Sequence, residues 1–571
     1  MKKKILASLL SVALAVSLLA GCGGGGDAPA ETTTDTETSA DAEETPAAET
    51  VSGDTNVVYT NAGPLEFFEY PWWNMGQYTH TKLMFETLIG MDENMGPTTE
   101  NGMAESYELS EDGLTFTVTL RDGLMWHDGQ EVTTDDVLWS MATILNDTIL
   151  ANNLLKAVMG SIEGAEDVQA GTTDTFSGVT VDGNTITVQF SEVCPNALLG
   201  FSLFHILPKH CLEDADFTQF QQDDFWQNPI GSGPFKLEEV RIGEYAYFVP
   251  FEGYWAGTPT FNVQSWASSA EADANLVTNA TGGQLDYAYT KTYTDVQALQ
   301  DTEGINIHDV SVNYTRWIML NQYKKDENTD SPLKDVRVRQ AIAYAIDKAT
   351  ICEQIFEGAA LPGDGTLTPT GSDWKAEGLE SYDYNPDRAR ELLAEAGWDS
   401  STTLDMVYYY TDQQTIDLMA IIQQQLAEVG INVEPRLIEG DVTTQLNARP
   451  TSTDENGISG VDWDMAYGAL SATSPFDYYE RFGSDNASNV CTPGSEELDG
   501  YLEELTSTAD VDKQKEAYAK IEAYHAENML YVPLYYQPVW VVTSDKIDSN
   551  VETWGNPQFS WDWKIESWTL Q

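Results

Sequence analysis

Cysteine and histidine are the residues of this chain best suited to metal or redox chemistry, and their spacing predicts neither. The five cysteines contain no CxxC pair, and the six histidines form no cluster with metal-ligand spacing. We therefore predict no metal site. Cys194 and Cys211 are close enough in sequence to form a bridge, but free thiols are equally compatible with the pattern. Beyond Cys22, the cysteines concerned are Cys194, Cys211, Cys352 and Cys491.

Candidate nucleophiles and carboxylates give no sign of an enzyme. The chain has neither a Gly-x-Ser-x-Gly elbow nor a His-Glu-x-x-His motif. With 92 acidic residues, a pair of carboxylates is too common to indicate a hydrolase. Gly231 and Gly233 form a tight turn before a strand, which is the wrong context for a phosphate-binding loop. We expect a protein that performs no catalysis and needs no cofactor.

The cysteine with the most informative surroundings is Cys22. It follows lysines at positions 2–4, an apolar run over 5–20 and the sequence Leu-Ala-Gly immediately before it. The apolar run is short for a transmembrane helix, which needs about 20 residues. The arrangement resembles the lipobox of bacterial lipoproteins, with an ordinary signal peptide as the alternative. The resemblance implies that residues 1–21 are a signal peptide and that the Cys22 sulfur carries a diacylglyceryl group.

Composition predicts how the rest of the chain behaves. Residues 22–55 are small, acidic and free of aromatic side chains, which predicts a disordered tether after the lipidated cysteine. The whole chain has 28 basic and 92 acidic residues, a net charge of −64, which excludes nucleic-acid binding by electrostatic repulsion. Its 571 residues, 42% hydrophobic, suit a globular body of two to four domains.

Short strand and helix patterns alternate from residue 56 onward, which predicts an α/β architecture. Strands are expected where apolar and polar residues alternate after a turn, at 114–120 and 185–190. Helices are expected where apolar residues recur at helical spacing, at 335–354, 386–396 and 416–429. These strands and helices must position the side chains of any binding site in the chain.

Eight segments in order resemble the solute-binding protein family 5, the peptide-, dipeptide- and nickel-binding lipoproteins of ABC importers. The first reads FTVTLRDGLMWHDG, and another reads NPIGSGPFKL. One segment alone would be weak, but the ordered set covers about residues 85–540. The segments lie at 116–129, 228–237, 254–259, 333–348, 385–398, 422–433, 461–467 and 532–535.

The resemblance implies a periplasmic-binding-protein-like fold of type II, with two α/β lobes joined by a two-strand hinge. It places lobe 1 at about 56–310 and 533–571, with the inserted subdomain of the large peptide-binding subgroup at about 84–225. Lobe 2 is expected at 311–532. Two crossing strands can absorb a rotation that closes the lobes on a ligand.

The resemblance also implies partners and location. The solute is expected to be small, and an oligopeptide is the expected class. The receiving complex is expected to be an ABC permease with two permeases and two ATPases. We expect a monomer, held by its lipid on the outer face of the cytoplasmic membrane.

Candidate ligand residues follow from the same resemblance. In the first lobe they are Gln77, Tyr78, Thr79 and His80. In the second lobe they lie in the loop after 464–466, namely Tyr467, Gly468, Ala469, Leu470, Ser471 and Thr473. Peptide binders of the family place an aspartate near the end of this loop to hold the ammonium group of the peptide.

This chain departs from the family pattern at that point. Thr473 stands where the aspartate is expected, and Leu470 stands where an aromatic residue is usual. Asp477, four residues after Thr473, is the nearest downstream acid that could substitute. If it does not, the ligand is a blocked peptide, an oligosaccharide or a metal chelate.

Other candidates are an arginine and several aromatic residues. Arg449 aligns with a family arginine that faces the ligand and could bind a carboxylate with two hydrogen bonds, while a surface ion pair is the alternative. Trp374 and Tyr408 are possible aromatic walls, although core packing is the more frequent fate of such residues. Four bulky residues in a row at 70–73 are hard to bury together, so we expect Trp72 and Trp73 to be exposed in the cleft or at its rim.

Overall fold

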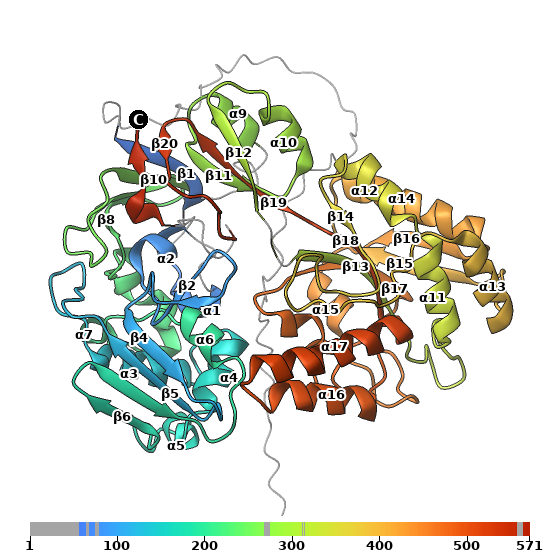
Figure 1. Cartoon of the computed structure of the whole chain (residues 1–571), viewed down its shortest axis with the longest axis horizontal. Coiled ribbons are helices and arrows are strands. Elements are labelled where there is room, and N and C mark those ends of the chain that lie inside the picture. Colours follow the sequence, from blue (N-terminus) through green and yellow to red (C-terminus); the bar gives the residue numbers. More distant parts are fainter. Residues whose placement is uncertain are drawn as a thin grey trace, which may run out of the picture.

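The computed structural model describes residues 56–63, 68–74, 79–267, 275–310, 312, 314–556 and 564–571. The expected signal peptide, Cys22 and the tether lie outside these ranges, as do Gln77 and Tyr78. Figure 1 shows two bodies joined by a narrow crossing, with the N-terminal half of the chain mostly in one and residues after about 314 mostly in the other. We call these bodies the first and second lobes.

Two sheets of the first lobe lie near the crossing. One has the order β1-β10-β9-β8 and the other the order β11-β19-β12. Helices α9 (Leu276–Thr281) and α10 (Tyr293–Leu299) share an apolar cluster with the second sheet. The strands are β1 (Val57–Gly63), β8 (Phe235–Arg241), β9 (Tyr245–Pro250), β10 (Asn262–Ala267), β11 (Tyr287–Thr290), β12 (Ile305–Val310) and β19 (Val539–Ser544).

A subdomain inserted between β1 and β8 forms the lower part of the first lobe in Figure 1. Its sheet has the order β4-β5-β7-β6, and the two expected strands appear in it as β5 and β7. Burial alternates along β5, because one face packs on helices such as α6. The strands are β4 (Ala104–Leu109), β5 (Thr115–Leu120), β6 (Val179–Asp182) and β7 (Thr185–Gln189), beside the short pair β2 (Gly90–Met91) and β3 (Pro97–Thr98).

Short helices occupy the chain between β1 and β8 together with this inserted sheet. They are α1 (Pro71–Asn74), α2 (Thr79–Met84), α3 (Thr134–Ile144), α4 (Asn153–Gly160), α5 (Ala165–Gln169), α6 (Ala197–Leu203) and α7 (Lys209–Leu212), followed by the 3-10 helices η1 (Phe217–Gln222) and η2 (Asp224–Gln227). At the end of the chain, β20 (Ile547–Asp548) pairs with β21 (Thr569–Leu570), next to η5 (Ile565–Ser567).

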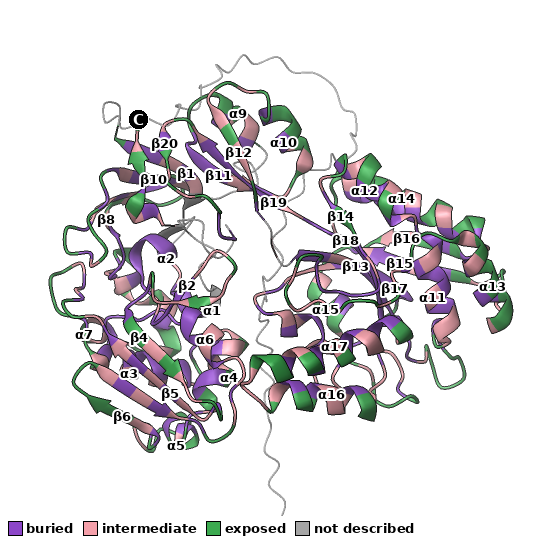
Figure 2. Cartoon of the chain, viewed as in Figure 1, coloured by how far each residue is buried: buried purple, intermediate pink, exposed green. Residues whose placement is uncertain are grey.

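The second lobe is built on one sheet with the order β14-β18-β13-β17-β15-β16. Separate apolar clusters lie on its two faces, and Figure 2 shows buried strands beneath helices that are exposed on their outer side. The strands are β13 (Tyr314–Leu320), β14 (Leu361–Pro362), β15 (Thr403–Tyr408), β16 (Asn432–Leu437), β17 (Met465–Ser471) and β18 (Tyr531–Tyr536).

Its helices are α11 (Val336–Ala345), α12 (Lys348–Phe356), α13 (Pro386–Ala396), α14 (Gln413–Glu428), α15 (Val442–Asn447), α16 (Glu496–Thr506) and α17 (Val511–Asn528), with η3 (Pro475–Tyr478) and η4 (Glu480–Phe482). The helix expected at 386–396 is confirmed. The single helix expected at 335–354 is wrong, because Ile346 turns to extended backbone and the Asp347 side chain caps a new helix. The third begins earlier than expected, at the cap Asp412.

The chain crosses between the lobes twice. The first crossing lies between β12 and β13, and the second between β18 and β19. The second comes later than the boundary expected at 532, because β18 stays paired with β13 and β14 up to Tyr536. Gln537 stands at this crossing, and its backbone N–H donates to the Tyr314 carbonyl over 2.9 Å. The two crossing segments are therefore hydrogen-bonded to each other.

The cysteine question left open by the sequence is answered in favour of thiols. Cys194, Cys211, Cys352 and Cys491 are all free, and all but Cys211 are buried. Within the described ranges, no helix is long and apolar enough to cross a bilayer.

Candidate functional site

One edge of the second-lobe sheet borders the first lobe. Strand β15 runs parallel to both β16 and β17, so their carboxyl ends share an edge. At this edge Ser471, the last residue of β17, pairs with Tyr314, the first residue of β13 after the crossing. Ligands of α/β sheets bind outside the carboxyl ends of the strands. We call this border, formed by the carboxyl ends of β15, β16 and β17 and the start of β13, the crossing edge, and it is the candidate site.

The segment expected to be a ligand-binding loop is mostly strand. Tyr467 is buried, and its hydroxyl shares a hydrogen bond of 2.7 Å with the Tyr535 hydroxyl. Gly468 is also buried, and a Cβ added there would lie 3.0 Å from the indole nitrogen of Trp317. Both residues therefore pack within the second lobe, and the ligand contact expected of them stays a prediction. Only the last three residues of β17 are half-exposed, namely Ala469, Leu470 and Ser471.

A tight turn follows β17 and involves the acid proposed to replace the missing aspartate. Oδ2 of Asp477 accepts hydrogen bonds from the Thr473 N–H (2.9 Å), the Thr473 hydroxyl (3.0 Å) and the Ser474 N–H (3.0 Å). These bonds close a capping box at the start of η3. Trp374 supports the turn, since its ring packs edge-on against Phe476 at 5.3 Å. Asp477 thus brings a carboxylate to the position, with one oxygen committed to the turn.

Glu480 adds a second acid beside this turn. Burial, together with the negative charge of Asp477, raises the pKa of Glu480 from 4.5 to about 7. In the described part of the chain, its carboxylate makes no hydrogen bond or ion pair. The turn after β17 can therefore hold two carboxylates close together, which is a suitable environment for an ammonium group.

The remaining expected residues lie in different environments. Trp72 is a core residue: it is buried, its indole N–H donates to the His205 carbonyl over 2.8 Å, and its ring stacks on Phe220. The cleft or rim position expected for it is wrong, because Phe220 of η1 and His205 of the α6–α7 connection cover it. Tyr408 is half-buried at the end of β15. The side chains of Trp73, Thr79 and His80 lie outside the described set.

Arg449 is exposed, and its guanidinium donates to the Asn486 carbonyl over 3.4 Å. Among the described residues it makes no ion pair. Its proposed role in binding a carboxylate stays a prediction.

Sequence reasoning did not find the arginine at the crossing edge. Arg316 follows Tyr314 on β13, and its Nε donates to the Gln537 side-chain oxygen over 2.8 Å. Its Nη1 is buried and has no hydrogen-bond partner among the described residues. Tyrosine rings surround the guanidinium, with the centres of Tyr410 and Tyr467 at 4.4 and 5.7 Å. No motif signals this position, since its partners come from distant parts of the chain.

Two of the resembling segments meet for a structural purpose. The backbone N–H of His127 donates to the Gly231 carbonyl over 2.8 Å, and the His127 ring lies 3.0 Å from the Gly233 carbonyl. Burial lowers the pKa of His127 to about 4, so the ring is neutral at physiological pH. Trp126 is buried and the His127 ring packs on Phe251, so both residues hold the first lobe together.

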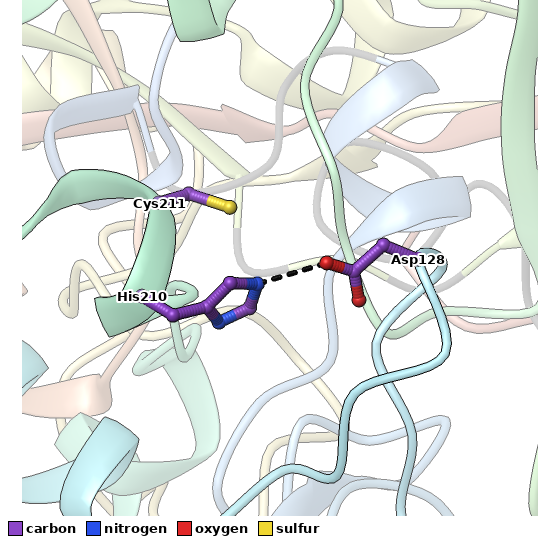
Figure 3. A group of neighbouring side chains, drawn as sticks. All are labelled: Asp128, His210 and Cys211. Atoms are coloured by element: carbon purple, nitrogen blue, oxygen red, sulfur yellow. Dashed lines mark hydrogen bonds and ion pairs between the residues drawn. The ribbon is translucent and has the colours of Figure 1, made fainter.

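A group with metal-ligating chemistry lies away from the crossing edge, in the inserted subdomain (Figure 3). One ligand atom from each of Asp128, His210 and Cys211 lies within 4.8 Å of the others. His210 Nε2 and Asp128 Oδ2 are 3.0 Å apart. Burial and the charge of Asp128 raise the pKa of the Cys211 thiol to about 11, so the sulfur keeps its proton. The hydrogen-bonded pair ties the Asp128 turn to α7.

A cavity of about 400 Å³ lies in the second lobe beside the loop 371–381. Its lining includes Asp364 and Lys375 but none of the expected ligand residues. The Lys375 ammonium is already satisfied by Asp364, by the Thr368 carbonyl and by the Tyr536 hydroxyl. We therefore regard this cavity as separate from the crossing edge.

Comparison with known proteins gives consistent results. The sequence model of the bacterial extracellular solute-binding proteins, family 5, matches residues 98–489. The oligopeptide-binding protein AppA of Bacillus subtilis is 24% identical over 476 residues, which is 80% of this chain and 81% of AppA. The dipeptide-binding protein of Escherichia coli is 28% identical over 348 residues, 58% of this chain and 62% of that protein.

Solved structures share the fold. The ABC transporter substrate-binding protein CtaP of Listeria monocytogenes aligns with a TM-score of 0.73 and 23% identity, covering 87% of this chain and 96% of CtaP. Lactococcal OppA, solved with an endogenous peptide in the closed conformation, aligns with a TM-score of 0.69 and 22% identity, covering 88% of this chain and 98% of OppA. The two-lobed fold of type II expected from the sequence is thereby confirmed.

Proposed function

Because this chain belongs to the bacterial extracellular solute-binding proteins, family 5, we propose that it captures oligopeptides between its two lobes for import. The family match over residues 98–489 carries the proposal. Relatives named as oligopeptide- and dipeptide-binding proteins support peptides as the class of solute. The receiving partner is an ABC permease with two permeases and two ATPases. The protein itself performs no chemistry on the solute.

The chemistry of the crossing edge supports a peptide. The half-exposed end of β17 can pair with an extended peptide backbone as an added strand would. Asp477 on η3 and Glu480 on η4 supply carboxyl groups for an ammonium group, and Arg316 on β13 supplies positive charge. A zwitterionic peptide matches both charges. Closure of the lobes would exclude water and strengthen each of these hydrogen bonds.

We further propose that the protein works on the outer face of the cytoplasmic membrane as a lipid-anchored monomer. The lipobox-like sequence before Cys22 supports this, and an acidic tether over 22–55 would hold the body away from the bilayer surface. Metabolic labelling with an alkyne-bearing fatty acid tests it. The wild-type chain should be labelled, whereas Cys22→Ser should not.

Native mass spectrometry tests the solute class. Protein purified without refolding from rich medium should carry a population of peptide masses, which fragmentation would sequence. In parallel, a peptide library should raise the melting temperature. An empty protein whose melting temperature no peptide raises would contradict the proposal.

The hydrogen bonds of Asp477 favour a second candidate solute, a peptide with a blocked N-terminus. Oδ2 of Asp477 is already used by Thr473 and Ser474. If the remaining oxygen and Glu480 do not hold an ammonium group, N-acetylated and free forms of a bound peptide should bind equally well. Isothermal titration of both forms distinguishes the two candidates.

A further inference from the structure

We propose that Asp128, His210 and Cys211 form a binding site for a divalent transition-metal ion, with zinc as the expected ion. The site lies in the inserted subdomain, away from the crossing edge, so the proposal does not depend on the proposed function. Its three side chains supply one oxygen, one nitrogen and one sulfur, which are the donor atoms of protein zinc sites. The carboxylate and a thiolate together would neutralise the two charges of the ion.

The first argument is the convergence of the three donor atoms. Figure 3 shows the side chains pointing towards a shared space between α7 and the turn that carries Asp128. The donor atoms all lie within 4.8 Å of one another, and His210 Nε2 is 3.0 Å from Asp128 Oδ2. Around a tetrahedral zinc ion, bonds of about 2.0 Å to nitrogen and oxygen and about 2.3 Å to sulfur place donor atoms roughly 3.3–3.6 Å apart. Small movements of the three side chains therefore suffice to surround one ion.

The second argument is that both elements of the site are already fixed. The Asp128 carboxylate accepts from the Gln130 N–H over 3.0 Å and from the Gln130 side chain over 3.2 Å. Asp136, buried on α3, accepts from the Lys209 N–H over 3.0 Å and so fixes the start of α7. Outer contacts of this kind orient metal ligands and raise affinity. The ion would replace only the hydrogen bond between His210 and Asp128.

The protons of the site must rearrange when the ion binds. Nε2 of His210 must carry no hydrogen, so the imidazole proton moves to Nδ1. The Cys211 thiol releases its proton to the solvent, and the sulfur binds as a thiolate. The side chains of His210 and Asp128 are 26% and 27% exposed, so a water molecule can reach the ion and fill the fourth position.

The spacing of residues in the sequence does not reveal this site. Asp128 is 82 positions from His210, whereas zinc motifs are recognised by ligands that are a few residues apart. The two segments meet only in the folded subdomain, where Asp136 of α3 holds the start of α7. An ion bound here would join the Asp128 turn to α7 and stabilise the inserted subdomain.

Titration of the full-length protein with Zn²⁺ and with Co²⁺ tests the proposal. Wild type should retain one Zn²⁺ per chain against a competing chelator, which removes ions held weakly by surface acids. Bound Co²⁺ should give a sulfur-to-cobalt charge-transfer absorption in the near ultraviolet, and Cys211→Ser should abolish it. His210→Gln and Asp128→Asn should weaken Zn²⁺ binding by about tenfold or more, because loss of an outer contact alone costs about 10–100-fold. Circular dichroism establishes that each variant is folded.

Asp122→Asn is the matched control for Asp128→Asn. Asp122 is also exposed, and each of the two aspartates precedes a glycine with positive φ in a turn of the inserted subdomain. The control should bind Zn²⁺ as tightly as wild type does. Wild type that retains no Zn²⁺ against the chelator would overturn the assignment. Equal Zn²⁺ affinity in wild type and Cys211→Ser, or bound Co²⁺ without the charge-transfer absorption, would overturn it as well.

Discussion

Arg316 and Asp477 place opposite charges along one edge of the second-lobe sheet, and each is positioned by a local network. Gln537 and the tyrosine rings fix the guanidinium of Arg316. The backbone of Thr473 and Ser474 fixes the carboxylate of Asp477. Preorganisation of this kind lowers the entropy cost of binding. Charge, rather than shape alone, is therefore expected to select the ends of a peptide.

Replacing Asp477 with Asn tests whether negative charge selects the N-terminal end of a bound peptide. Asn retains an acceptor oxygen for the turn, so the free energy of unfolding should change by less than about 1 kcal/mol. The loss of negative charge should reduce the preference for a free over an acetylated N-terminus by roughly tenfold. Titration calorimetry with both forms of one peptide measures the preference.

Asp441→Asn is the control, because Asp441 makes the same kind of hydrogen bonds to Thr444 at the start of α15. It should leave the preference unchanged. An unaltered preference in Asp477→Asn as well would mean that Asp477 only stabilises the turn.

The sequence alone predicted part of this site. It identified Asp477 as the nearest replacement acid, because the family pattern marks the end of β17. It did not identify Arg316, because Gln537, which accepts a hydrogen bond from the guanidinium, is 221 positions away in the sequence. It misplaced Trp72, because four bulky residues in a row were expected to resist burial, yet Phe220 and Trp226 enclose Tyr70 and Trp72.

At the scale of elements, turns and caps account for most of what sequence reasoning found. The Asn385 side chain caps the start of α13 and Gly397 ends it in left-handed conformation, at the bounds expected for this helix. The break after α11 was missed, because Asp347 was counted within a continuous apolar pattern instead of as a cap. Gly231 is required for contact between elements: a Cβ there would lie 1.7 Å from the Met84 carbonyl.

Helix α17 carries a buried carboxyl that should make stability depend on pH. Glu522 is fully buried, and its Oε2 accepts from the Ala376 N–H over 2.5 Å. Burial raises its pKa from 4.5 to about 7. The folded state therefore binds the proton more tightly than the unfolded state. The contribution of this group to stability is full below pH 4.5, falls as the pH rises towards 7, and is constant above that.

Glu522→Gln should remove this dependence. The free energy of unfolding of the variant, relative to wild type, should rise between pH 5 and pH 8 by an amount on the order of 3 kcal/mol. Chemical denaturation at several pH values measures it. Glu527→Gln, at an exposed position of the same helix, is the control and should run parallel to wild type. A parallel curve for Glu522→Gln would contradict a raised pKa at this site.

At the scale of the whole molecule, described residues of the two lobes touch both near the crossing and far from it. Near the crossing, the Gln297 side chain of α10 donates to Glu357 after α12 over 2.5 Å. Far from it, Gly113 of the inserted subdomain packs so closely on the second lobe that an added Cβ would lie 2.7 Å from the Ala509 side chain. Opening about the crossing would break the distant contact first.

The two-lobed α/β fold could be predicted because the resembling segments are spread over the whole body. The precise crossing could not, because strand β18 pairs with β13 and β14 beyond the expected boundary. Pairing of strands that are distant in sequence is set by the packing of the complete sheet. Local sequence patterns therefore do not predict which distant strands pair.

Small-angle X-ray scattering of the soluble body, with and without a peptide library, tests the central claim most directly. The account predicts that the radius of gyration falls when peptides bind, because the lobes rotate about the crossing and enclose the solute. Native mass spectrometry of the same samples establishes occupancy. An unchanged radius of gyration in protein shown to be saturated with peptide would contradict capture by closure of the lobes.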